Sequence, residues 1–141
     1  MAKKKVFISF DFENDKHYKY ILNGWDKNPK FDFEFDDKSS QEINSWNISV
    51  VKRALSRKIN EADYTLVIVG KEANKLHRDY KEIGYRNWQN YEVAKSKEHG
   101  NKLIGVKINS LYTSPEEVLG SGAKWAMSFS QESIIKALES I

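Results

Sequence analysis

Short hydrophobic runs recur along this chain, and they predict five β-strands. The run at residues 64–69, Tyr-Thr-Leu-Val-Ile-Val, is unbroken and rich in β-branched residues, as is typical of a central strand in a parallel sheet. Residues 6–10 and 103–108 are further apolar runs that predict buried strands. Residues 31–35 alternate phenylalanine with acidic residues, which indicates an edge strand with one polar face, and residues 125–127 predict a short fifth strand.

The intervals between the strands show helical periodicity. A first helix is expected to begin at a cap formed by Asn14 or Asp15 and to end at Asn28-Pro29. Its hydrophobic residues follow the spacing i, i+3, i+4, i+7: Tyr18, Ile21, Leu22 and Trp25. A second helix is expected from about Ser45 to Ala62. Its buried side should consist of Ile48, Val51, Leu55, Ile59 and Ala62.

The helices in the second half of the chain are predicted from residues typical of helix ends as well as from the spacing of hydrophobic residues. One helix should carry Trp88 and Glu92 and contain Gly84 in its interior. The Ser-Pro-Glu-Glu sequence at residues 114–117 has the form of a capping box and predicts a short helix that ends at Gly120. Two serines are candidate caps for the last helix: Ser128 and Ser130.

The regular alternation of strands and helices predicts a single three-layer α/β domain over residues 1–141. We expect a central, mostly parallel, five-stranded sheet of flavodoxin-like order 2-1-3-4-5. Right-handed crossovers place the carboxyl ends of all strands at one edge, and the crevice between strands one and three is the default ligand site. The residues expected at this edge are Ser9, Phe10, Asp11, Asp36, Asp37, Gly70 and Lys71.

The segment at residues 86–95 offers the best candidate for chemistry. Trp88 and Glu92 are four residues apart, so a helix would place them on one face, with Tyr85 and Lys95 on the same stripe. A carboxylate beside an aromatic wall is how protein environments tune acids for glycosidic chemistry. A surface glutamate next to a half-buried tryptophan would give the same pattern.

Composition narrows the classes of function. No apolar stretch approaches the roughly 18 residues of a membrane span, and the Met-Ala-Lys-Lys-Lys start lacks the pattern of a signal peptide. The chain has no cysteine, which excludes disulfides and thiolate sites and suits the cytoplasm. The net charge of +3 is mild, and we expect no nucleic-acid partner. The most basic helix face is then a solvated one: Lys52, Arg53, Arg57 and Lys58.

Several alternatives on the same fold lack their required residues. The turn after strand one, Asp11-Phe-Glu-Asn-Asp15, has no glycine for a nucleotide phosphate cradle. Strand three ends in Val69-Gly70, without the acceptor aspartate of a two-component receiver, which the acids after strand one otherwise resemble. The three histidines have no metal-ligand spacing, and the acids near the strand ends fit a solvated loop better than a Mg²⁺ site, so no metal is expected.

Five segments together resemble the TIR-like proteins of bacterial antiphage defence, in particular the TIR-like component of the Thoeris system. They are residues 5–11, Trp46 in a polar loop before a long helix, residues 65–70, the Trp-x-x-x-Glu pattern of residues 88–92, and residues 98–109. The resemblance covers about residues 4–110, whereas the region after Asn109 matches little.

The resemblance implies a TIR-like fold and an enzyme of NAD⁺ nucleosidase or ADP-ribosyl cyclase type. NAD⁺ would be its substrate, with no separate cofactor, and Glu92 its catalytic residue. The product would be an ADP-ribose-derived, cyclic signalling nucleotide that activates a separate effector, with self-association or a phage protein as trigger. The expected substrate contacts are Ser9, Phe10, Asp11, Asp37, Trp46 and Trp88. The alternative is a TIR-like assembly module without catalysis.

Overall fold

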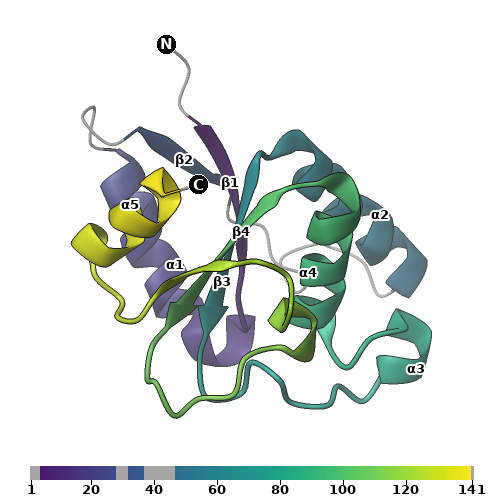
Figure 1. The fold of residues 1–141 in the computed structure, drawn as a ribbon. Coiled ribbons are helices and arrows are strands. Elements are labelled where there is room, and N and C mark those ends of the chain that lie inside the picture. The colour runs from purple at the N-terminus through teal and green to yellow at the C-terminus, as the bar shows by residue number, and fades with distance from the viewer. Residues whose placement is uncertain (1–3, 28–31, 37–46, 141) are drawn as a thin grey trace.

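The strands form one parallel sheet in the order β2-β1-β3-β4-β5, which confirms the predicted topology (Figure 1). The computed structural model describes residues 4–27, 32–36 and 47–140. The strands are β1 (Lys4–Ser9), β2 (Phe33–Asp36), β3 (Tyr64–Val69), β4 (Lys102–Lys107) and β5 (Lys124–Ala126). The helical segments are α1 (Phe12–Asp26), α2 (Ile48–Glu61), α3 (Tyr80–Ile83), α4 (Trp88–His99), the 3₁₀ turn η2 (Glu116–Val118) and α5 (Gln131–Glu139).

Helices cover both faces of the sheet, and β3 is buried along its whole length between them. Leu66 and Ile68 of β3 pack toward α1 and α5, where Leu22 and Ile134 join the same hydrophobic cluster. Alternate residues of β3, beginning with Val67, pack toward α4. This two-sided burial explains why β3 has an unbroken apolar sequence.

The sheet edge and the second helix agree with the sequence pattern. In β2, Phe33 and Phe35 are buried and Glu34 is exposed, as the alternation predicts for an edge strand. Asn47 caps α2 by accepting hydrogen bonds from the backbone N–H groups of Ser49 and Val50. Four of the five residues predicted for the buried side of α2 are buried, and the fifth, Ile48, is half-buried. The predicted start at Ser45 lies outside the described residues.

The prediction of a continuous helix through Gly84 is wrong. Gly84 adopts a left-handed conformation with φ of 86° and ends α3, which is the role for which glycine is best suited. A new helix, α4, then begins after Asn87, whose side chain accepts a hydrogen bond from the Asn90 backbone N–H. Tyr85 therefore lies between the helices rather than on a common stripe with Lys95.

Two predicted helix starts also need correction. The Ser114 capping box does not form: η2 is a single 3₁₀ turn, and its Glu116 and Glu117 N–H groups donate to the side chains of Asn74 and Asn90. Amide side chains from other segments thus take the place of the local cap. The first helix begins at Phe12, before the two residues predicted to cap it. Of the two candidate caps for α5, Ser130 is the one that caps the helix.

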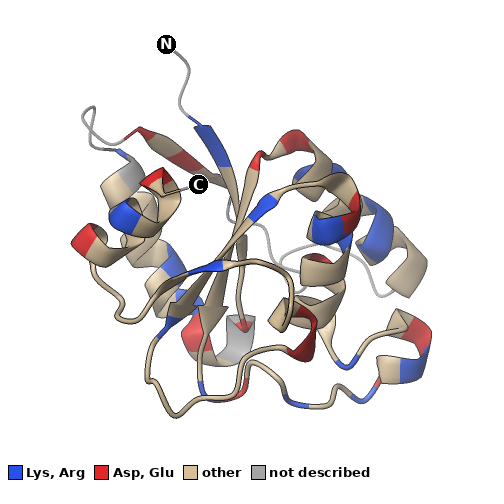
Figure 2. Ribbon diagram, viewed as in Figure 1, with Lys and Arg blue, Asp and Glu red and all other residues tan. Residues whose placement is uncertain are grey.

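The central strand β3 carries no charged residue, whereas lysines stand at both ends of β4. Figure 2 shows Lys and Arg along the turns of α2. Among the described residues, no helix is both long and apolar enough to cross a membrane.

Replacement of Gly105 by alanine should destabilise the protein. A Cβ atom at Gly105 in β4 would lie 2.4 Å from the Trp125 ring, which packs over this strand. Overpacking of this kind costs about 1–3 kcal/mol. Urea unfolding should show a lower midpoint for Gly105→Ala and partial recovery when Trp125→Leu is added. Gly24→Ala in α1 is the matched control, because its Cβ would meet nothing within 4 Å and should stabilise the helix. Equal midpoints for both glycine variants would contradict this packing.

Candidate functional site

Glu92 is a buried acid at the carboxyl ends of the central strands. It lies in the second turn of α4, and its side chain is enclosed, with only 2% of the residue exposed. The Ser9 hydroxyl, at the end of β1, donates a hydrogen bond of 2.7 Å to Glu92 Oε1. Ser9 is paired with Val67 of β3, so Glu92 sits where β1 and β3 are adjacent. The structure therefore brings Ser9 and Glu92, two of the predicted site residues, into direct contact.

Gln89 fixes α4 to both strands, and sequence reasoning did not identify it. Its Nε2 donates to the backbone oxygens of Ser9, at 3.2 Å, and Ile68, at 2.9 Å. Gln89 precedes Glu92 by three residues, so the two share one helix face. The position of a polar residue one turn before the candidate acid was the feature of the sequence that could have identified Gln89. Its two acceptors belong to distant strands, which the sequence pattern does not reveal.

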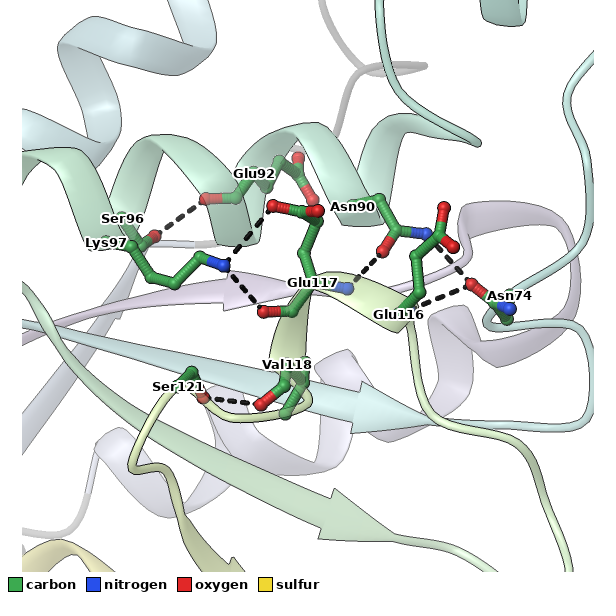
Figure 3. A network of polar contacts seen from close by, with 9 residues as sticks. All are labelled: Asn74, Asn90, Glu92, Ser96, Lys97, Glu116, Glu117, Val118 and Ser121. Carbon is green, nitrogen blue, oxygen red and sulfur yellow. Dashed lines mark hydrogen bonds and ion pairs between the residues drawn. The ribbon is translucent and has the colours of Figure 1, made fainter.

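A second polar network holds the start of α4 against the loops that follow β3 and β4 (Figure 3). Asn90 is fully buried; its amide donates to Asn74 and accepts from the Glu117 backbone N–H. Lys97, two turns along α4, forms an ion pair of 3.2 Å with Glu117. These contacts fix the position of the helix that carries Glu92.

Burial changes the acidity of Glu92. Desolvation raises the pKa of its carboxyl from 4.5 to about 8, and the hydrogen bond from Ser9 opposes part of this rise. At neutral pH the resting protein thus holds Glu92 mainly in its protonated form. A raised pKa in an enclosed acid beside the sheet's switch point is a typical feature of functional sites.

The other predicted site residues lie on both sides of the sheet. Trp88, the first residue of α4, is half-buried, and its ring meets Tyr91 edge-on at 5.6 Å in the cluster between α4 and α2. Phe10 belongs to the cluster beneath α1 and α5, and the Asp11 carboxylate accepts a hydrogen bond from Asn14. Their contacts with a substrate stay predictions. Asp37 and Trp46 lie outside the described residues, as does the side chain of Asp36.

One further acid near this edge was misassigned from the sequence. Asp15, predicted as a candidate cap, is instead buried within the first turn of α1 with 5% exposure. Its carboxyl group lies against Gly70, the residue that follows β3. Two buried acids, Glu92 and Asp15, therefore approach the ends of β1 and β3 from opposite helical layers.

A surface groove lies outside this edge. It has a volume of about 460 Å³ and is lined by α2 residues, including Lys52 and Arg57, and by Tyr91. Lys52 already donates to the Glu82 backbone oxygen at 2.8 Å. Among the residues that the structure describes, no cluster of histidine, aspartate and glutamate side chains could hold a metal ion.

The fold and the site define a doubly wound α/β domain with a buried acid at its switch point. Among solved structures, the chain is similar to the CMP N-glycosidase BcmB of Clostridium botulinum, with a TM-score of 0.61, 14% identity, and coverage of 96% of this chain and 98% of that chain. The 2-deoxyribosyltransferase of Bacillus psychrosaccharolyticus gives a TM-score of 0.57 at 14% identity, over 92% of this chain and 90% of that chain. At these identities the likeness concerns the fold alone.

A family model described as "Thoeris protein ThsB, TIR-like domain" matches residues 7–113. The chain belongs to this family. A Bacillus cereus (strain MSX-D12) protein named "Putative cyclic ADP-D-ribose synthase ThsB1" is 28% identical over 111 residues, which are 76% of this chain and 53% of that protein. The chain thus spans about half the length of this curated relative.

Stability should depend on pH through Glu92. Between pH 4.5 and about 8, the folded protein retains a proton that the unfolded chain releases, because burial raises the pKa of Glu92. The stabilising contribution is therefore complete below pH 4.5 and is lost as the pH rises toward 8, by up to about 1.4 kcal/mol per pH unit. Urea unfolding of Glu92→Gln should show a shallower decline than wild type over this range. Glu98→Gln, an exposed acid on the same helix, is the control, and identical profiles for all three proteins would contradict the assignment.

Removal of the Ser9 hydroxyl should raise the pKa of Glu92 further, because the hydrogen bond from Ser9 lowers it. Carboxyl ¹³C NMR titration of Ser9→Ala would measure this shift. Ser56→Ala removes a hydroxyl that contacts the Tyr91 hydroxyl instead and should leave the Glu92 titration unchanged. A pKa that falls or stays constant in Ser9→Ala would show that Ser9 does not control this acid.

Proposed function

We propose that this chain cleaves NAD⁺ between nicotinamide and ribose and forms an ADP-ribose-derived, cyclic signalling nucleotide that activates a separate effector. The observation that carries the proposal is the enclosed carboxyl of Glu92, hydrogen-bonded by Ser9 at the switch point of the sheet. Membership of the ThsB TIR-like family supports it, as does the name of the Bacillus cereus relative.

The chemistry needs a negative charge more than a proton donor. When the bond from ribose to nicotinamide breaks, its electron pair neutralises the cationic ring, and positive charge develops on the sugar. A carboxylate held where water is excluded stabilises that charge. The positive nicotinamide ring of a bound substrate lowers the pKa of Glu92 toward the ionised form, because opposite charges favour ionisation.

The fate of the sugar cation depends on access of water. A nucleophile on the adenosine half would close a ring and lose its proton, whereas water would give ADP-ribose and likewise release a proton. Ring closure requires that water be excluded while the nucleotide is bound. The 2% exposure of Glu92 in the free chain fits an enzyme that stays inactive until self-association or a phage protein opens the site.

Replacement of Glu92 by glutamine should abolish nicotinamide release. The isosteric amide retains an acceptor for the Ser9 hydroxyl but loses the negative charge, and we expect a loss of roughly 100-fold or more in kcat. Nicotinamide would be followed by chromatography with NAD⁺, in the presence and absence of phage-infected cell lysate. Circular dichroism would confirm folding, and Glu98→Gln should retain activity because Glu98 is exposed and pairs with Lys95. A fully active Glu92→Gln enzyme would refute the catalytic role.

The second candidate function is assembly without catalysis. The packing of Trp88 against Tyr91 favours it, because a tryptophan that stabilises the interface of α4 with α2 needs no substrate to explain it. This candidate would be supported if lysate promoted self-association of the chain while no nicotinamide appeared under any condition.

A further inference from the structure

The carboxyl group of Asp15 has a hydrogen-bonding atom without a partner. Asp15 is 5% exposed, and its Oδ2 is buried without a hydrogen bond to any part of the chain that the structure describes. Its backbone N–H donates to the backbone oxygen of Asp11 at 2.7 Å, so the residue is held in the first turn of α1. A buried acceptor left unpaired costs about 1–3 kcal/mol. This cost calls for an explanation.

Gly70 makes room for this carboxyl group. A Cβ atom at residue 70 would lie 2.0 Å from Asp15 Oδ2 and 2.5 Å from its Cγ and Oδ1. Gly70 follows β3 directly, three residues after Val67, the partner of Ser9 in β1. The carboxyl therefore lies at the switch point itself, at the start of the loop that leads from β3 toward α4.

The surroundings of Asp15 limit what it could bind. Burial raises the pKa of its carboxyl to about 6, and the nearby Asp11 carboxylate adds to the rise. A phosphate on this side would face two acids and be repelled. A sugar hydroxyl carries a proton to donate and no charge, so it can pair with the carboxyl oxygen in either protonation state.

We propose that Asp15 binds a ribose hydroxyl of the nucleotide, from the helical layer opposite Glu92. The inference rests on the proposed function and deepens it, because it adds a second acid to the substrate site. Glu92 approaches from α4 and Asp15 from α1, so a nucleoside between them would meet one carboxyl from each helical layer. Its hydroxyl would supply the donor that Asp15 Oδ2 lacks.

Asp15→Leu tests this role with a side chain of similar shape that has no acceptor. The variant should unfold at a higher urea concentration than wild type, because it removes an unsatisfied buried carboxyl. It should also bind ADP-ribose at least tenfold more weakly by isothermal titration calorimetry. Asp15→Asn, which keeps one acceptor oxygen, provides a second variant should leucine fail to fold, and it should bind between the two. Asp63→Asn is the matched control, because Asp63 is exposed at the opposite end of β3.

Deoxy analogues identify the group that Asp15 contacts. ADP-ribose analogues that lack a single 2′- or 3′-hydroxyl on either ribose should include one for which wild type and Asp15→Leu bind with equal affinity. An Asp15→Leu defect of the same size with every analogue would overturn the assignment to a ribose hydroxyl. Wild-type affinity of Asp15→Leu for ADP-ribose would overturn any role for Asp15 in binding while leaving the proposed function intact.

The same titrations separate this inference from the proposed function. A wild-type protein that binds ADP-ribose but never releases nicotinamide, even with infected-cell lysate, would refute NAD⁺ cleavage, and the Asp15 comparison would still decide the binding role. A wild-type protein that binds neither ADP-ribose nor NAD⁺ would overturn both.

Discussion

The hydrogen bond between Ser9 and Glu92 joins α4 to the end of β1 through a buried carboxyl group. A hydrogen bond from one hydroxyl does not offset the free-energy cost of desolvating a carboxyl group, and the pKa of Glu92 is therefore raised. The adjacent residues supply the missing stabilisation: Tyr91 packs into the cluster with α2, and Val93 into the cluster with β3 and β4. Glu92 is thus held between two hydrophobic contacts that its own helix makes.

The start of α4 is fixed by amide side chains that each bond to several partners. Asn87 accepts a hydrogen bond from the Asn90 backbone N–H and donates to the backbone oxygens of Ala73 and Lys75, both at 2.9 Å. Asn90 connects the same turn to Asn74 and to η2. The loop after β3 is consequently bound to the helix that carries the acid. A change in the position of either segment should therefore move Glu92.

The sequence pattern predicts the strands well because a strand that is buried on both faces consists almost entirely of apolar residues, as β3 does. It fails where a residue's role depends on distant partners. The sequence alone predicts that Gly84 lies inside one helix, because it does not show that Asn87 caps a new helix three residues later. Ser114 reads as a cap because Asn74 and Asn90, which cap η2 instead, are far away in the chain. The sequence pattern singled out Glu92, which the structure shows to be buried beside Ser9, but it did not single out Gln89.

Two buried acids at one sheet edge are the feature on which both the proposed function and the proposed role of Asp15 depend. A domain that served only as a scaffold would gain stability from apolar side chains of similar shape at both positions, since buried carboxyls with few partners are destabilising. Glu92 has one hydroxyl donor, and Asp15 Oδ2 has none within the described residues. The absence of a side chain at Gly70 leaves space for the carboxyl group of Asp15. The two acids share a position at the ends of β1 and β3, where a doubly wound fold binds its ligands, and the proposed ligand would supply the donor that Asp15 Oδ2 lacks.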